Sequence, residues 1–410
     1  MAFNNPFIAL RHKNFRYYWM GMCISLIGTW MQNIAQPWLA YTLTGSPFLL
    51  GLVGALQFTP MLLFSLFAGV MVDRFPKKKI LFFTQSASLA ITLTLAILVQ
   101  SGHVQYWHIL VCATALGFIN TLDMPTRQSF VIELVDREDL MNGIALNSAM
   151  FNMARVIGPA VAGIVMGYFG IAFCFFANSI SFAAVVFSLF FIKPRAIPVK
   201  RRDSGKIIFD IKEGLRYIYQ HKILLTAVFG LAIIGTFAMN NNVLVPVFAK
   251  LILNQKETGF GFLLSFSGVG AFFGAMLVAI TSKSGPARFV RQVVPLIIGI
   301  FLILNGYANT YLATGLCLAV TGFFFNMYSS TINSVMQLNT TNEFRGRVMS
   351  VYTLVFSGST PLGNLYAGLA AEHFGPRFGF VACGLITILL LAPLYVFMIR
   401  LGKSQKPAPG

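Results

Sequence analysis

Three charged side chains interrupt otherwise apolar stretches of this sequence and could take part in proton or ion chemistry. They are Asp123, Arg127 and Arg155. A charge at the centre of a membrane-spanning helix costs roughly 2.5–3.5 kcal/mol on insertion scales, so it indicates a function or a fixed partner. A carboxylate that loses its hydration takes up a proton more readily, whereas a nearby arginine opposes this.

Asp123 is the carboxylate best placed to bind a proton inside a membrane. The sequence has 12 Asp and Glu residues, and all except Asp123 fall in or near the segments that connect the apolar stretches. Arg127 lies one helical turn after Asp123, and Arg155 lies on the next helix at a similar depth from the same side. Pro125 should disturb the helix between Asp123 and Arg127. Three roles stay open for Asp123: proton coupling, a structural ion pair, and contact with substrate.

Uncharged polar side chains gather in three other apolar stretches. Lipid offers such groups no hydrogen-bond partners, so they should face either a cavity or one another. We expect a substrate cavity, and structural hydrogen bonds between helices are an equally weighted alternative. The residues are Gln32, Asn33, Gln36, Asn240, Asn241, Asn242, Asn326, Tyr328, Ser329 and Asn333.

The elements that must position these residues are membrane-spanning helices. Of the 410 residues 57% are hydrophobic and 10% are charged, which is too little polar surface for a soluble protein. The apolar runs are continuous rather than alternating, which excludes an outer-membrane barrel. We therefore predict an all-α membrane protein with twelve transmembrane helices. The expected spans are 17–43, 47–72, 80–101, 106–132, 139–167, 171–192, 222–249, 258–282, 290–308, 310–337, 346–371 and 377–400.

The net charge of +18 is an orientation signal rather than a nucleic-acid site, because the basic residues lie in short loops between spans. Only Lys250, Lys256 and Arg377 fall in loops on the side opposite the termini. The positive-inside rule then predicts a multi-pass membrane protein with both termini cytoplasmic. Membrane lipid is its expected surrounding, and nucleic acid is not an expected partner.

The two halves of the chain repeat each other at a shift of 205 residues. This predicts two pseudo-symmetric six-helix bundles, residues 1–192 and 222–410, joined by a basic cytoplasmic linker, 193–221. The linker contains an amphipathic pattern, for which membrane-surface binding and a plain tether are both open. Its apolar face consists of Ile207, Ile211, Leu215 and Ile218. The paired glycines are 54 with 259, 69 with 274, 117 with 322, 158 with 363, 163 with 368 and 170 with 375.

A glycine, an aspartate and a run of bases end the second apolar stretch. The pattern Gly69-x3-Asp73-Arg74-x2-Lys77-Lys78-Lys79 resembles the loop between helices 2 and 3 of the major facilitator superfamily. Pro76 stands where that family usually has glycine. The resemblance implies a gating loop formed by Gly69, Asp73, Arg74 and Lys78. In it Asp73 would bond the start of the eleventh helix, near 345–347, and the alternative is an ordinary basic loop.

Small residues on the fifth span predict close helix packing. Gly158, Pro159 and Gly163 resemble the helix 5 signature of antiporters in the same superfamily. Gly270 and Gly274 offer a partner face on the eighth span. A flexing seam between the halves and simple tight packing are both compatible with this pattern.

The stretch from Asp123 to Pro159 resembles a branch of bacterial exporters within that superfamily, similar to enterobactin exporters and macrolide efflux pumps. It contains Asp-Met-Pro-Thr-Arg-Gln-Ser-Phe from residue 123, Glu-Asp-Leu-Met-Asn-Gly-Ile-Ala-Leu-Asn from residue 138, and Ala-Arg-Val-Ile-Gly-Pro from residue 154. The resemblance implies two rocking bundles, a central cavity, and export of a small amphipathic molecule, driven by proton antiport.

Other chemistry is not indicated. The sequence has no phosphate-binding loop of the G-x-x-x-x-G-K-[ST] type, its five histidines are scattered, and its five cysteines lie in apolar runs. We therefore expect no cofactor, no metal, no enzymatic activity and a monomeric protein. The leading forms are a multidrug or macrolide pump and a siderophore or metabolite exporter. A channel and an intramembrane enzyme are weaker alternatives.

Overall fold

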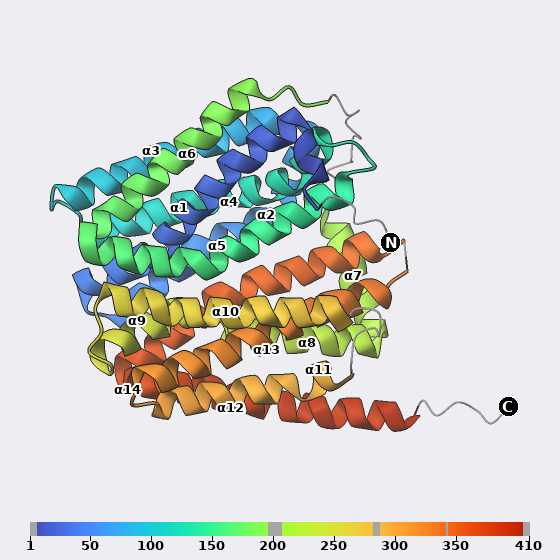
Figure 1. Ribbon diagram of the computed structural model, residues 1–410. Helices are drawn as coiled ribbons and strands as arrows, with labels where there is room; N and C mark the ends of the chain where they lie inside the picture. Colours follow the sequence, from blue (N-terminus) through green and yellow to red (C-terminus); the bar gives the residue numbers. More distant parts are fainter. Residues whose placement is uncertain (1–5, 196–206, 282–287, 342, 405–410) are drawn as a thin grey trace. The chain divides into compact units, whose positions relative to one another are not determined.

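The structure is a computed structural model that describes residues 6–195, 207–281, 288–341 and 343–404 (Figure 1). The regular secondary structure in these ranges is helical. Long apolar runs form helices in a membrane because, in a helix, the backbone N–H and C=O groups pair within the same segment. The first half contains η1 (Ile8–Arg11), α1 (Lys13–Thr44), α2 (Pro47–Arg74), α3 (Lys77–Gln100), α4 (Tyr106–Leu134), α5 (Leu140–Phe169) and α6 (Ile171–Phe191). The second half contains α7 (Ile207–Gln220), α8 (Lys222–Phe237), α9 (Asn241–Leu251), α10 (Glu257–Thr281), α11 (Arg288–Gln292), α12 (Val294–Tyr307), α13 (Tyr311–Leu338) and α14 (Arg345–Ser404).

The described helices account for the twelve predicted spans. Nine helical stretches among the described residues are long and apolar enough to cross a membrane, with α8 and α9 taken as one stretch. To these we add α1 with 32 residues and the apolar α12 with 14 residues. The twelfth span is the second part of α14, which Gly375 divides into two helices.

The internal repeat is visible in the backbone at two glycines. Gly170 ends α5 with φ 84° and ψ 166°, and Gly375 divides α14 with φ 82° and ψ 163°. These positions are 205 residues apart, the shift at which the sequence repeats. A positive φ is strained for a residue with a Cβ atom, so each repeat uses glycine for the same sharp turn between consecutive spans.

The seventh predicted span is interrupted, which the hydropathy pattern did not predict. α8 ends at Phe237 and α9 begins at Asn241, so the run of three asparagines lies at the break. The Asn240 side chain donates to the Thr236 carbonyl oxygen at 2.9 Å, which satisfies one of the carbonyl groups left open at the end of α8.

The chain divides into two compact units. In the first unit, α1 packs against α5 and α6, and α3 packs against α4 and α6. In the second unit, α12 packs against α13 and α14, and α8 packs against α14. Each unit also takes in a short piece from the other half of the sequence. The first comprises Met1–Gly45, Leu56–Ser204 and Gln255–Ser265, and the second comprises Ser46–Ala55, Gly205–Asn254 and Phe266–Gly410.

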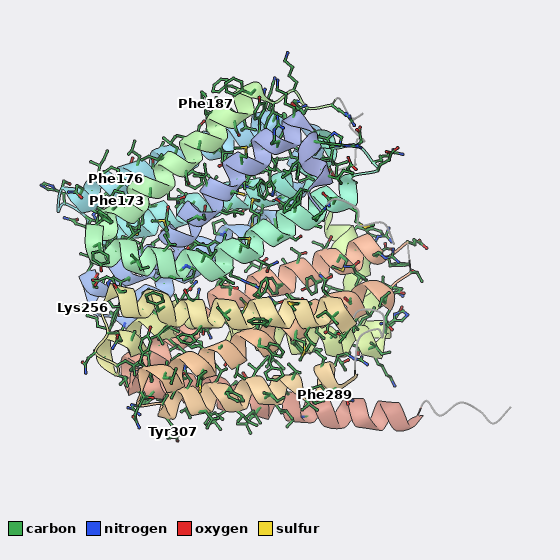
Figure 2. All side chains as sticks on the ribbon, in the orientation of Figure 1. Phe173, Phe176, Phe187, Lys256, Phe289 and Tyr307 are labelled. Atoms are coloured by element: carbon green, nitrogen blue, oxygen red, sulfur yellow. The ribbon has the colours of Figure 1, made fainter. Side chains whose placement is uncertain are left out.

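The outward face of α6 is aromatic. Figure 2 shows Phe173 and Phe187 pointing away from the helix bundle of the first unit, where their side chains are 46% and 65% exposed. The buried face of the same helix carries Asn178, Ser179 and Ser181. Apolar residues outside and polar residues inside are the arrangement expected for a helix whose solvent is lipid.

The linker helix α7 packs against the beginning of α14 within the second unit. Tyr217 stacks on Phe344 with ring centroids 4.6 Å apart, and Glu213 forms an ion pair with Arg347 at 2.8 Å. Of the expected apolar face, Ile218 is buried, Ile211 is half-buried and Leu215 is 49% exposed, so membrane-surface binding and a plain tether both stay predictions. Residues 196–206 and the side chain of Ile207 lie outside the described residues.

Gly158 has a different partner from the one we expected. A Cβ atom at this position would overlap the Trp30 side chain of α1, in the same unit. Gly163 does approach α10, but at Gly261, whose Cα would lie 3.0 Å from a Cβ at position 163. Pro159 is buried beside Gly158. Small residues let any neighbouring backbone approach, so the sequence alone does not specify which helix does so.

Gly270 and Gly274 lie close to another helix of the second unit, and their predicted role as a partner face for α5 stays a prediction. Added Cβ atoms there would overlap the backbone of α13 at Ala319 and Phe323. Both glycines therefore serve the packing of α10 on α13 inside the second unit.

We predict that Gly158→Leu destabilises the protein itself, since Trp30 must be displaced to admit the side chain. Overpacking of this kind costs about 1–3 kcal/mol, which a lowered melting temperature of the detergent-solubilised protein would report. Gly69→Leu is the matched control, because an added Cβ there meets nothing within 4 Å. Unchanged melting of Gly158→Leu combined with lost transport would instead indicate a moving seam.

Candidate functional site

Asp123 is buried in the first unit and is surrounded by donors. Its side chain lies on α4 and the residue is 2% exposed. One carboxylate oxygen, Oδ1, accepts hydrogen bonds from the Thr84 hydroxyl at 2.6 Å and from the Gln85 amide at 2.7 Å, both on α3. The other oxygen, Oδ2, forms an ion pair with Arg127. The charge of a buried carboxylate is thus compensated on both oxygens, as burial requires.

Pro125 does not separate the pair. α4 continues through it from Tyr106 to Leu134, so Asp123 and Arg127 stay one turn apart on the same helix face. A proline lacks a backbone N–H and cannot donate to the carbonyl one turn earlier. The Thr126 and Ser129 hydroxyls bond other carbonyl groups of this turn, Thr126 to that of Leu122 at 2.6 Å.

Two unsatisfied polar atoms adjoin the ion pair. The Tyr18 hydroxyl and Gln85 Oε1 are buried, and neither has a hydrogen-bond partner among the described residues. The Tyr18 ring meets Phe130 edge-on at 5.4 Å, and its hydroxyl lies within electrostatic range of both Asp123 and Arg127. Unpaired buried polar groups are costly, so this site keeps hydrogen-bonding capacity that the observed contacts do not use.

Sequence reasoning identified Asp123 and Arg127 but missed Thr84, Gln85 and Tyr18. A signal was present for the α3 residues, because Thr84 and Gln85 are adjacent polar side chains in a strongly apolar span. Tyr18 gave none, since an aromatic residue near the start of a span is common at membrane interfaces. Arg155 donates to Asn152 on its own helix at 3.1 Å.

A second polar cluster in the first unit joins three helices. Gln32 Oε1 on α1 accepts from Thr92 on α3 at 3.1 Å and from Asn178 on α6 at 2.6 Å. Gln32 also donates to Gln36 one turn later at 3.4 Å. Gln32 is thus hydrogen-bonded between helices, whereas its contact with Gln36 lies within α1. Asn33 is half-buried on the same helix, and a cavity role for these residues stays a prediction.

The candidate polar residues of the second unit differ in how far they are buried. Asn240 is buried and also donates to the Cys383 sulfur at 3.7 Å, and Asn241 donates to Ser267 at 3.3 Å. Asn326 is half-buried and accepts from Ser330, whereas Tyr328 is buried. Substrate contact by Asn240, Asn241, Asn326 or Tyr328 stays a prediction.

The loop between α2 and α3 is short and well defined. α2 ends at Arg74 and α3 begins at Lys77, with Pro76 preceding the helix at φ −58°, an angle natural to proline. The proline in place of glycine is therefore accommodated. Lys78 donates to the Ile192 carbonyl at the end of α6, at 2.8 Å. Asp73 is exposed, and its expected contact near 345–347 stays a prediction.

The model of the family described as "transmembrane secretion effector" matches residues 4–409. The staphyloferrin A transporter of Staphylococcus aureus is 25% identical over 386 residues, covering 93% of this chain and 95% of that protein. The multidrug efflux pump Tap of Mycolicibacterium fortuitum is 24% identical over 392 residues, with 93% and 95% covered. Macrolide efflux protein A of Streptococcus pyogenes is 22% identical, with 92% and 94% covered.

Solved structures share the fold at much lower sequence identity. A bacterial homologue of the human lysosomal transporter Spinster superposes with a TM-score of 0.77 at 11% identity, covering 98% of this chain and 99% of that one. The nucleoside transporter NupG gives a TM-score of 0.71 at 12% identity, with 94% and 98% covered. The predicted superfamily and its helical membrane fold are confirmed. The chain is a multi-pass membrane transporter rather than an enzyme, and it belongs to the transmembrane secretion effector family of the major facilitator superfamily.

Proposed function

We propose that this protein exports a small amphipathic molecule across the bacterial cytoplasmic membrane by alternating access, in exchange for protons. The observation that carries the proposal is the carboxylate of Asp123, which is buried beside Arg127 and hydrogen-bonded to Thr84 and Gln85. A proton-coupled carrier needs a titratable group shielded from water, and an ionisable residue inside a membrane span is a functional candidate by default.

The surroundings of Asp123 suit a change of protonation. Protonation removes the charge that holds Arg127, so the arginine is then free to seek another partner. The unpaired Gln85 Oε1 and Tyr18 hydroxyl are nearby groups that a protonated Asp123 or a released Arg127 could engage. Arg155 is the further basic residue that the sequence places at a similar depth on α5. An exchange of partners would make proton binding depend on conformation, which is what coupling requires.

Two substrate classes are open within this proposal. Relatives named as a multidrug efflux pump and as a macrolide efflux protein favour drug export. The relative named as staphyloferrin A transporter favours export of a siderophore or another metabolite. Deletion of the gene, followed by susceptibility tests against a drug panel and analysis of secreted metabolites, separates the two. A flux that saturates with rising substrate concentration indicates a carrier, whereas a flux that does not saturate indicates a channel.

The orientation in the membrane is part of the proposal. The excess of Lys and Arg in the loops on the side of both termini supports a cytoplasmic location for that side. Cysteine accessibility to a membrane-impermeant thiol reagent would test it, with new cysteines placed next to exposed Lys79 and next to Arg377.

We predict that Asp123→Asn abolishes accumulation driven by a pH gradient in proteoliposomes. A gradient of one pH unit supplies about 1.4 kcal/mol, enough for about a tenfold substrate ratio in one-for-one exchange. Wild-type protein should approach that ratio, whereas the variant should only equilibrate its substrate. A variant that still concentrates substrate with unchanged pH dependence would contradict the coupling role.

A purely structural pair predicts a different pattern. Breaking a buried ion pair by removing one partner typically costs 3–5 kcal/mol, because the other charge is left uncompensated. If Asp123→Asn together with Arg127→Gln restores the transport that the single change removes, the pair serves structure and not coupling. If the double variant folds normally but still does not accumulate substrate along a pH gradient, the result supports the coupling proposal.

We predict that Asp73→Asn leaves membrane insertion intact but slows transport. Loss of a contact that couples the loop to the conformational change by about 1–3 kcal/mol should lower the initial flux about 5- to 150-fold. The matched control is Lys79→Gln, an exposed base on the first turn of α3. Equal fluxes in wild type and Asp73→Asn would leave the loop with a topological role alone.

A further inference from the structure

The linker helix α7 is attached to the second unit at two places, and a membrane span begins at each of them. Its last residue, Gln220, is separated by a single residue from Lys222, the first residue of α8. Its middle packs on the first turn of α14, where a Cβ atom added at Gly214 would lie 2.8 Å from the carbonyl oxygen of Arg347. A helix held at both of these points runs along the membrane boundary instead of projecting away from it.

One face of α7 is occupied by its contacts with the beginning of α14. Ile218 is buried, and Tyr217 stacks on Phe344. Glu213, the acidic side chain that the structure describes on this helix, is paired with Arg347 at 2.8 Å. The negative charge described on α7 is therefore engaged on the side that meets α14.

The opposite face of α7 combines large apolar side chains with bases. Phe209, Leu215 and Tyr219 are 55%, 49% and 76% exposed, and Lys212 and Arg216 are also exposed. With 3.6 residues in each helical turn, these five positions fall within about a third of the circumference of the helix. We call this set of five residues the outer face of α7.

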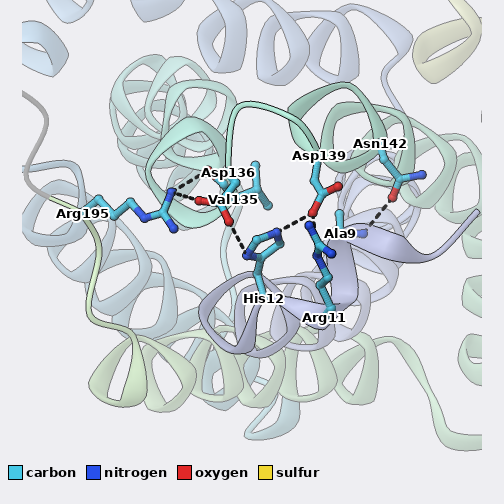
Figure 3. Close-up of polar contacts among 8 residues, drawn as sticks. All are labelled: Ala9, Arg11, His12, Val135, Asp136, Asp139, Asn142 and Arg195. Atoms are coloured by element: carbon cyan, nitrogen blue, oxygen red, sulfur yellow. Dashed lines mark hydrogen bonds and ion pairs between the residues drawn. The ribbon is translucent and has the colours of Figure 1, made fainter. Parts of the chain in front are cut away.

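The two bases of the outer face are not neutralised by acids of this protein. Elsewhere such pairing occurs: Figure 3 shows Arg195 of the first unit bound to Asp136, and Arg347 of the second unit is paired with Glu213. Lys212 and Arg216 form no ion pair with any residue that the structure describes. The outer face therefore presents two positive charges to its surroundings.

A surface of this composition is complementary to anionic phospholipid. Apolar side chains of an interfacial helix enter the boundary between headgroups and acyl chains, where lysine and arginine attract anionic headgroups. Long basic side chains lay their apolar stems along such a surface and keep the charge at its edge, so bases and apolar groups can share one face. In water, a contiguous exposed apolar patch usually marks a site of interaction.

We propose that the outer face of α7 binds anionic phospholipid at the membrane surface. Phe209, Leu215 and Tyr219 enter the interface, and Lys212 and Arg216 contact the phosphate groups. The surface differs from the apolar face that helical spacing alone indicated, since Ile218 of that face is buried against the second unit. The proposal depends neither on proton coupling nor on the substrate that is carried.

The test uses the full-length protein in nanodiscs of phosphatidylcholine with an equal amount of phosphatidylglycerol. An environment-sensitive fluorophore is attached to Leu215→Cys, and the parent protein is treated in parallel to subtract any signal from its five native cysteines. Phosphatidylglycerol brominated in its acyl chains should quench this label more strongly than brominated phosphatidylcholine. Iodide in the water should quench it far less than a label on His103→Cys, which lies in an exposed loop.

The contribution of the bases is measured by titrating the quenching against the fraction of brominated lipid. Lys212→Gln combined with Arg216→Gln should lower the preference for phosphatidylglycerol on the order of twentyfold, because each base near an anionic membrane surface contributes about fivefold. Lys79→Gln combined with Arg137→Gln is the matched control, since it removes the same charge from exposed bases of the first unit. That control should retain the wild-type preference.

Three results would overturn the proposal. In the first, iodide quenches the label at position 215 as strongly as the label at position 103. In the second, the double variant of α7 keeps the wild-type preference for phosphatidylglycerol while helical circular dichroism shows it to be folded. In the third, the label becomes shielded only when a soluble protein extract is added, which would assign the outer face to a protein partner.

Discussion

A buried polar group in a membrane bundle needs a hydrogen-bond partner within the protein, and the packing of the first unit depends on this constraint. Asp123 on α4 is held by Thr84 and Gln85 on α3, and Gln32 on α1 is held by donors on α3 and α6. Lipid cannot substitute for these contacts inside the bundle. The two clusters therefore fix how α1, α3, α4 and α6 meet, in addition to the apolar packing between them.

The proposed coupling needs a site that can exchange hydrogen-bond partners. A network in which every donor and acceptor is paired is rigid, whereas the Tyr18 hydroxyl and Gln85 Oε1 leave alternatives beside Asp123 and Arg127. A carrier needs two arrangements of similar free energy, and a proton that is bound in one of them shifts the balance. Our proposal for Asp123 combines these two features of one small region.

Much of the fold follows from the sequence, because charge-free apolar runs and turn glycines are local signals. The twelve spans, the turn at Gly170 and its repeat at Gly375 are of this kind. The break between α8 and α9 was not predicted, because the mean hydropathy of Lys222–Leu251 stays high although three asparagines lie at the break. The packing of α7 against α14 was not predicted, because an amphipathic pattern does not specify the surface that the apolar face meets.

Contacts between helices were predicted less well than the helices themselves. Asp123 and Arg127 could be paired because they lie one turn apart, but the α3 donors lie some forty residues away and no spacing rule connects them to α4. Gly158 was correctly read as a site of close approach, yet its neighbour is Trp30 rather than α10. A glycine in a helix indicates that another chain segment packs closely there, but it does not identify which segment.

The central claim is that Asp123 changes its protonation while the carrier works, and infrared difference spectroscopy tests it most directly. Reconstituted wild-type protein would be compared at about pH 8 and about pH 5 with Asp123→Asn. We predict a carboxylic-acid carbonyl band that appears on acidification in the wild type and is missing from the variant. Identical difference spectra for the two proteins would contradict the account.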